Sequence, residues 1–180
     1  MGNITTLLET INEGNNKALI TLYGNDPEVL QKQALRYSAV LEKFRETYPG
    51  DEVYVFSSPG RSEIGGNHTD HNHGRVLAGA VNLDNIAVAA INNTNIINII
   101  SAEYPPFKVD LSKLNPDKSE FYTSASLVRG ICSRMKELGF AIGGFNAVID
   151  GGVPKGSGLS SSASFEVLIG TILSHLFNEG

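Results

Sequence analysis

The chain has 180 residues, of which 41% are hydrophobic and 18% are charged, and its formal net charge is −5. This length and composition suit one folded core and differ from those of a disordered chain. The acidic balance, without a cluster of Lys and Arg, argues against a nucleic-acid-binding surface. No apolar stretch is long enough to cross a bilayer, so we expect no membrane partner. The single cysteine, Cys132, excludes an internal disulfide and fits a cytoplasmic protein.

The first fifty residues predict two helices. Thr6 and Glu9 have the spacing of a capping box, which predicts a helix near the N-terminus. Residues 26–48 predict a longer helix, because Asp26 can cap it and the following Pro-Gly can end it. We therefore expect residues 1–50 to form a helical extension ahead of the main domain.

The main domain, residues 51–180, mixes predicted strands and helices. Runs rich in β-branched and aromatic residues predict strands at 52–59, 75–93 (as one bent strand or two), 95–103, 106–111 and 145–151. A loop rich in Gly, His and Asn is expected over 60–74. Apolar residues at helical spacing predict helices at 123–139 and 161–177, with Cys132 as a small core residue. This order predicts an α+β fold with a mixed or antiparallel sheet.

A glycine-rich stretch, GGVPKGSGLSSSAS at 151–164, separates a predicted strand from a predicted helix. A helix N-terminus carries unpaired amide groups and a partial positive charge, and glycines let a ligand approach these groups closely. Such a geometry binds phosphate. One serine could cap the helix, another could contact a phosphate oxygen or Mg²⁺, and Lys155 could add charge. The alternative is an ordinary strand-to-helix turn with a serine cap, since the spacing matches neither common phosphate-binding pattern.

A polar stretch, SSPGRSEIGGNHTDHNHG at 57–74, is the second candidate for binding. Its Asp, Asn and His side chains can hydrogen-bond sugar hydroxyls, and Arg61 could stabilise a transferring phosphoryl group. Its three histidines and one aspartate could in principle bind zinc, but their spacing suits no standard site and no cysteine joins them. A solvated polar turn is the alternative for this stretch taken alone.

Together the two stretches resemble a known family. PGRSEIGGNHTDHNHG is similar to the galactokinase signature Pro-Gly-Arg-x-Asn-Leu-Ile-Gly-Glu-His-Thr-Asp-Tyr-x-x-Gly. VPKGSGLSSSAS resembles the second motif of the GHMP kinases, Pro-x-Gly-x-Gly-Leu-Ser-Ser-Ser-Ala, and the resemblance covers about residues 40–178. It implies the N-terminal domain of the GHMP kinase fold, a ribosomal-protein-like two-layer domain in which a mixed sheet carries helices on one face.

The resemblance also implies roles for individual residues. Arg61 falls on the family's catalytic arginine, and Asn67, His68 and Asp70 match its sugar-contacting residues. The Ser-rich loop would wrap the phosphates of ATP, with Ser162 as the contact of Mg²⁺. The matching loop residues are Lys155, Gly156, Ser157, Gly158, Leu159, Ser160, Ser161 and Ser162.

The implied activity is that of a sugar 1-kinase of the galactokinase type, which transfers the γ-phosphate of ATP to the anomeric hydroxyl of a galactose-type sugar. Asn67 stands where the family has Glu, and His71 where it has Tyr. A charged hydrogen-bond acceptor thereby becomes a neutral amide, which leaves the exact sugar open. The family's catalytic aspartate lies in a later motif, beyond Gly180. We therefore expect an N-terminal fragment that is inactive alone.

Other functions stay open at this stage. A galactokinase-like protein could bind sugar and ATP as a sensor without turnover, and an aspartate in the downstream motif would separate the two hypotheses. A mevalonate or homoserine kinase is a third possibility, although those families lack the His-Thr-Asp sugar loop. Metal binding is a fourth. For the full-length protein we expect a monomer with a small-molecule sugar as its partner.

Overall fold

The computed structural model describes residues 1–13, 16–67, 69–102, 104–154 and 156–180, and of Asp70 the backbone alone. The described strands form a six-stranded sheet in the order β1-β2-β3-β6-β4-β5. Neighbouring strands pair antiparallel except β4 and β6, which run parallel, so the sheet is mixed. The strands are β1 (Gly2–Asn3), β2 (Glu52–Gly65), β3 (Leu77–Ile91), β4 (Ile96–Ser101), β5 (Phe107–Asp110) and β6 (Phe145–Gly151).

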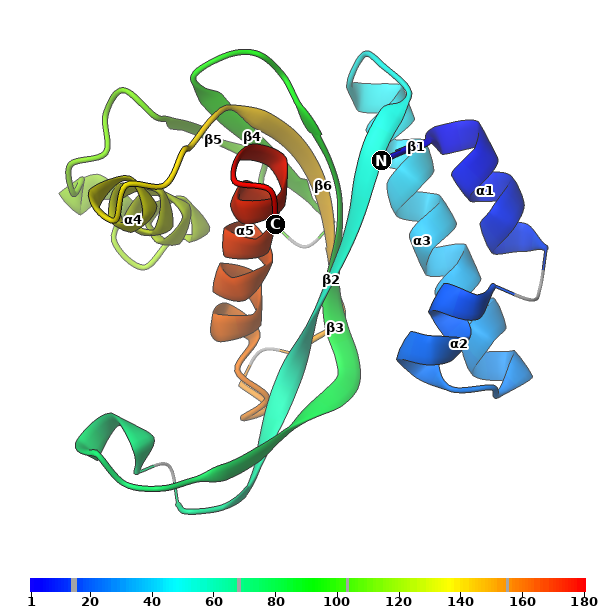
Figure 1. Ribbon diagram of the computed structural model, residues 1–180, viewed down its shortest axis with the longest axis horizontal. Coiled ribbons are helices and arrows are strands. Elements are labelled where there is room, and N and C mark those ends of the chain that lie inside the picture. The colour runs from blue at the N-terminus through cyan, green and yellow to red at the C-terminus, as the bar shows by residue number, and fades with distance from the viewer. Residues whose placement is uncertain (14–15, 68, 103, 155) are drawn as a thin grey trace.

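Helices cover both faces of this sheet (Figure 1). One face carries α4 (Ser124–Glu137) and α5 (Ser161–Phe177). The other carries α1 (Ile4–Asn12), α2 (Lys17–Tyr23) and α3 (Pro27–Thr47). Two short 3₁₀ helices, η1 (Asp70–Asn72) and η2 (Lys118–Glu120), lie in connections. Within residues 51–180 the helices lie on one face, as the resemblance implies, and the N-terminal helices add a further layer.

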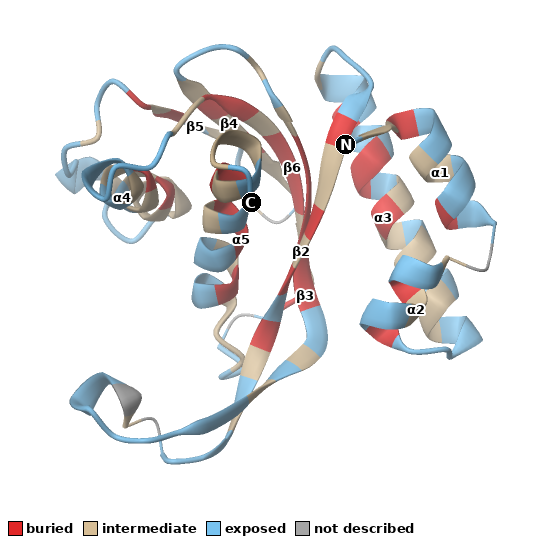
Figure 2. Cartoon of the chain, in the orientation of Figure 1, coloured by how far each residue is buried: buried red, intermediate tan, exposed pale blue. Residues whose placement is uncertain are grey.

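Each face of the sheet has its own apolar core, and the buried residues gather where helices meet strands (Figure 2). In β6, Ala147 and Ile149 belong to the core under α5, whereas Val148 between them belongs to the core under α3. Side chains alternate across a strand, so the central strands are buried on both faces. Cys132 is fully buried in the core under α5, and this burial raises the pKa of its thiol to about 11. It is a core residue, as predicted.

The helix boundaries confirm one predicted cap and correct another. Asp26 caps α3, as predicted, and its carboxylate accepts a hydrogen bond from the amide of Glu28 at 2.9 Å. The capping box at Thr6 is wrong, because α1 already begins at Ile4 and Asn3 supplies its cap. The short helix α2 was not predicted. None of the helices in the described ranges combines the length and the apolar character that a membrane span needs.

A long hairpin of β2 and β3 is the other difference from prediction. β2 continues to Gly65, so the stretch expected as a loop from residue 60 begins as a strand, and β3 is a single strand. The outer part of the hairpin projects from the sheet, is largely exposed, and bends toward the side that carries α5 (Figures 1 and 2). η1 lies at its far end.

Candidate functional site

The glycine-rich stretch connects β6 to α5, as predicted. Gly156 and Gly158 have φ angles of 69° and 78°, in the left-handed region that favours glycine. The hydroxyl of Ser157 donates to the carbonyl of Pro154 at 2.7 Å and accepts from the amide of Leu159 at 3.3 Å. The side chain of Ser157 is therefore used to close the turn.

The side chain of Ser160, the residue just before α5, does not cap the helix. Ser160 occupies the N-cap position with φ 58° and ψ 55°, and its side chain makes no capping hydrogen bond. The serine cap that the sequence suggested is therefore wrong, because a capping side chain reaches the helix amides from an extended backbone, not from a left-handed one. The side chain of Ser160 thus does not occupy the amides that open α5, which suits an anion bound there.

Arg61 of β2 lies beside the glycine-rich loop. Its amide donates to the carbonyl of Leu159 at 3.1 Å. At the preceding residue, Gly60, a Cβ atom would lie 2.9 Å from the same carbonyl and 3.1 Å from Val153. Glycine therefore permits the close approach of strand and loop. The structure thus joins the two motifs, which lie far apart in the sequence, at the Arg61–Leu159 hydrogen bond.

Buried polar side chains hold the first turn of α5 against the sheet. The amide nitrogen of Asn85 donates to the hydroxyl of Ser164 at 3.0 Å, and that hydroxyl donates to the carbonyl of Ser58 at 2.7 Å. All three residues are buried. Sequence reasoning missed Asn85 and Ser58, although an asparagine inside an otherwise apolar strand was a usable signal.

A cavity of about 890 Å³ opens at the start of α5. Ser161 and Ser162 line it from α5, and residues 123–127 line it from the first turn of α4. Much of the remaining lining is apolar or aromatic and includes Ile99, Tyr104, Pro105, Pro106, Phe107, Ile149, Val153 and Phe165. Its volume and its mixed lining are typical of a small-molecule or cofactor site. Sequence reasoning missed most of these residues, because the pairing of β4 with β6 and the packing of α4 bring them together.

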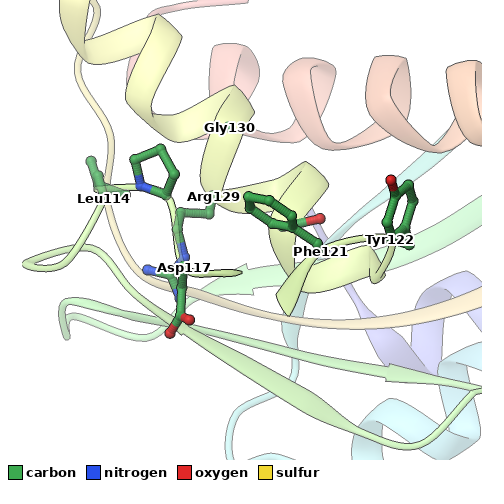
Figure 3. A pocket seen from close by; sticks show the side chains of 8 residues that line it. Leu114, Asp117, Phe121, Tyr122, Arg129 and Gly130 are labelled. Carbon is green, nitrogen blue, oxygen red and sulfur yellow. The ribbon is translucent and has the colours of Figure 1, made fainter. Parts of the chain in front are cut away.

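A smaller cavity of about 340 Å³ lies near the connection from β5 to α4 (Figure 3). Arg129 donates to both carboxylate oxygens of Glu120, at 2.8 and 2.7 Å, and so fastens η2 to α4. These hydrogen bonds raise the pKa of Arg129, although burial acts in the other direction. Tyr122 lines both cavities, is fully exposed, and has a φ of 66°. A left-handed backbone is uncommon for an aromatic residue.

The candidate sugar residues lie at the projecting end of the hairpin. Asn67 is exposed and has a φ of 52°, which asparagine tolerates. The backbone of Asp70 begins η1, while its side chain, His68 and Lys155 lie outside the described residues. Figure 1 shows this end of the hairpin away from the start of α5, on the same side of the sheet. The structure therefore brings Arg61, but not Asn67, to the glycine-rich loop.

Metal ligands were the remaining hypothesis from the sequence. Within the described residues, no group of three or more His, Cys, Asp or Glu side chains is placed to hold a metal ion. His68 and the side chain of Asp70, two members of the hypothetical zinc site, lie outside those residues. Ser162 is exposed and lines the larger cavity, so its hydroxyl can offer one oxygen to a cation there.

Two family models match the chain. The galactokinase galactose-binding signature matches residues 42–91, and the N-terminal domain of the GHMP kinases matches residues 126–180. The galactokinase of Lactococcus lactis is 37% identical over 147 residues, which are 78% of this chain and 36% of that protein. The chain thus spans little more than a third of the length of this curated relative.

Solved structures agree with these matches. The crystal structure of Lactococcus lactis galactokinase complexed with galactose superposes with a TM-score of 0.71 at 34% identity, covering 80% of this chain and 38% of that one. Mevalonate kinase of Methanococcus jannaschii superposes with a TM-score of 0.59 at 18% identity, covering 73% of this chain and 43% of that one, and supports the fold alone. The chain belongs to the GHMP kinase family, and within that family it is similar to the galactokinases.

Proposed function

We propose that this chain supplies the phosphate-binding loop and the sugar-binding hairpin of a galactokinase-type sugar 1-kinase. The reaction transfers the γ-phosphate of MgATP to the anomeric hydroxyl of galactose or a closely similar sugar. The observation that carries this proposal is the hydrogen bond between the amide of Arg61 and the carbonyl of Leu159, which joins the two motifs at one place. The similarity to a galactokinase that was crystallised with galactose supports the choice of sugar.

The nucleotide half of the site lies at the start of α5. The loop from Gly156 to Ser162 would wrap the phosphates, and the amides that open α5, which the side chain of Ser160 does not cap, would donate hydrogen bonds to them. The cavity of about 890 Å³ begins at Ser161 and Ser162 and offers apolar surface for the base. A nucleoside triphosphate requires hydrogen-bond donors for its phosphates and, beside them, an apolar cavity for its base.

Magnesium would enter this site together with the nucleotide. Mg²⁺ keeps several waters and commonly takes its other ligands from phosphates, so it needs few protein ligands. Ser162 would contribute one hydroxyl oxygen. Arg61 would stabilise the negative charge on the transferring phosphoryl group, since its backbone already lies against the loop. When bound, the cation neutralises phosphate charge.

The sugar half of the site lies on the hairpin. Asn67, His68 and Asp70 would hydrogen-bond the sugar hydroxyls, with Asn67 as a neutral acceptor where the galactokinase signature has a carboxylate. We expect weaker or altered sugar selectivity as a consequence. The domain boundary at residue 50, the cytoplasmic location and the monomeric state of the whole protein stay predictions.

Calorimetric titration of the 180-residue chain tests the proposal. We expect MgATP to bind, galactose to bind more tightly than glucose, and no galactose 1-phosphate to form, since the chain matches only about a third of a galactokinase. Ser162→Ala should weaken MgATP binding and leave galactose binding unchanged, and Asp70→Asn should do the reverse. A wild-type chain that binds no MgATP would contradict the nucleotide site, and sugar phosphate from the chain alone would contradict the expected inactivity.

A further inference from the structure

The buried polar residues of the described core gather at one place. Four polar or charged residues are buried there, namely Ser58, Asp84, Asn85 and Ser164. Asn85 lies on the α5 side of β3 and bonds Ser164, whereas the adjacent residue, Asp84, lies on the α3 side. Burying polar groups costs free energy unless they are paired. Their concentration where the glycine-rich loop leaves the sheet calls for a reason beyond general stability.

A single arginine of α3 links the middle of β3 to the end of β6 at this place. Arg36 donates from Nη1 to the carboxylate of Asp84 at 2.6 Å and from Nε to the carboxylate of Asp150. Its Nη2 donates to the carbonyls of the same two residues, at 2.7 Å for Asp84 and 3.1 Å for Asp150. The planar fork of a guanidinium makes such multiple contacts possible, which an ammonium group cannot reproduce.

Further donors complete the environment of the Asp84 carboxylate. The hydroxyls of Tyr23 and Ser57 both donate to its second oxygen. Burial and the hydrogen bond to Asp84 raise the pKa of Tyr23, so this hydroxyl keeps its proton at neutral pH. Burial tends to lower the pKa of Arg36, but the hydrogen bonds with both aspartates outweigh it and raise that pKa. The group is thus a paired and charged cluster.

The cluster touches the glycine-rich loop directly. The carbonyl of Asp84 accepts a hydrogen bond from the amide of Gly152 at 2.8 Å. A Cβ atom on Gly152 would lie 2.7 Å from Nη2 of Arg36 and 2.5 Å from the same carbonyl. Gly152 is therefore packed against the guanidinium, and the path by which the chain enters the loop depends on where Arg36 holds the end of β6 against the middle of β3.

We propose that Arg36, Asp84 and Asp150 form a clamp that positions the glycine-rich loop for the triphosphate of a nucleotide. The clamp acts from the sheet face opposite to the cavity, so Arg36 is a positioning residue that does not touch the ligand. If the loop is held in place before binding, less conformational entropy is lost when the nucleotide binds, and binding is stronger. The inference rests on the proposed function, because it assigns the clamp to the nucleotide half of that site.

The test combines nucleotide titration with hydrogen exchange on the 180-residue chain. Arg36→Lys keeps the charge but loses the fork, and Asp150→Asn keeps the shape but loses the charge. For each we expect the Kd for MgATP to rise on the order of tenfold, the Kd for galactose to stay unchanged, and the loop amides from Gly151 to Leu159 to exchange faster. Val40→Ala, in the same helix and buried, is the stability control, because its apolar side chain offers neither a hydrogen bond nor a charge to the clamp.

Each outcome decides something different. Weaker MgATP binding and faster loop exchange in both clamp variants, with neither change in Val40→Ala, support the clamp. Equal weakening by Val40→Ala would assign the effect to general stability and overturn the clamp. If the wild-type chain binds MgATP but the loop amides of the two clamp variants exchange at the wild-type rate, the clamp is also overturned. A wild type that binds no MgATP at all would overturn the proposed function, and the clamp's role in nucleotide affinity with it.

Discussion

The two candidate binding segments of this molecule are held in opposite ways. The glycine-rich loop is anchored from both faces of the sheet, by Asn85 and Ser164 on one side and by Arg36 with its aspartates on the other. The hairpin end that carries Asn67 is exposed, and the hydroxyl of Thr69 there donates a local hydrogen bond to the carbonyl of Gly66. A buried polar network holds the backbone that it contacts in one position, whereas an exposed hairpin end lacks this support.

From this difference we predict that the glycine-rich loop is preformed for binding, whereas a bound sugar would add order to the exposed hairpin end. Ordering a backbone costs conformational free energy for each residue that is fixed. We therefore expect the amides of the glycine-rich loop to lie close to the positions in which they would bind phosphate. Ordering the hairpin end, by contrast, would reduce the net free energy of sugar binding.

The largest expected effect concerns glycines in the two segments. Gly152→Ala forces a Cβ against the Asp84 carbonyl, whereas a Cβ on Gly65 in the hairpin would lie in open space. We expect Gly152→Ala to lower the free energy of unfolding by about 2 kcal/mol and to abolish most MgATP binding. Gly65→Ala should change neither. Chemical denaturation and calorimetry measure both, and equal effects of the two substitutions would remove the contrast.

Asparagines in the two segments provide a second comparison. Asn85→Ala removes the donor to Ser164 inside the core, and we expect a loss of about 1 kcal/mol in the free energy of unfolding. Asn72→Ala, at the exposed end of the hairpin, should leave that free energy unchanged. Urea denaturation followed by circular dichroism distinguishes the outcomes. A stable Asn85→Ala variant would show that the buried network does not hold the start of α5.

Proteolysis tests the order that a sugar imposes on the hairpin. Arg75 is exposed between η1 and β3, so trypsin should cleave after it in the free chain. Galactose at ten times its Kd should slow this cleavage about tenfold, because the ligand stabilises the uncleavable form. Mass spectrometry of timed digests gives the rate, with glucose as the control sugar. An unchanged rate under saturating galactose would place the sugar elsewhere.

The smallest effect is expected at Ser58. Its hydroxyl is buried and has no hydrogen-bond partner among the described residues, while its carbonyl accepts from Ser164. Ser58→Ala should therefore leave the melting temperature unchanged or raise it slightly, because an unpaired buried hydroxyl costs free energy. The Ser164→Ala variant is the counterpart and should lower it. A marked loss in Ser58→Ala would reveal a partner for that hydroxyl.

Local sequence was sufficient for much of the fold. Helix α3 follows from Asp26 and its apolar stripe, and each of its ends lies within one residue of the predicted range 26–48. Strand β6 follows from its run of apolar residues and has the predicted bounds. The Thr6 capping box failed because Asn3 caps the helix three residues earlier, at the amide of Thr5, so that Thr6 lies inside α1. The helix α2 was missed because seven residues carry little periodic signal.

For the candidate site, the residue types alone indicate the chemistry of the parts: glycines and serines before a helix, and an Arg, an Asn and an Asp in a polar stretch. Which of these parts meet depends on how the chain folds. The contact of Arg61 with Leu159 and the grip of Arg36 on Asp84 and Asp150 join residues that are distant in the sequence. Such contacts depend on strand order and helix packing, which a local pattern of residue types does not encode.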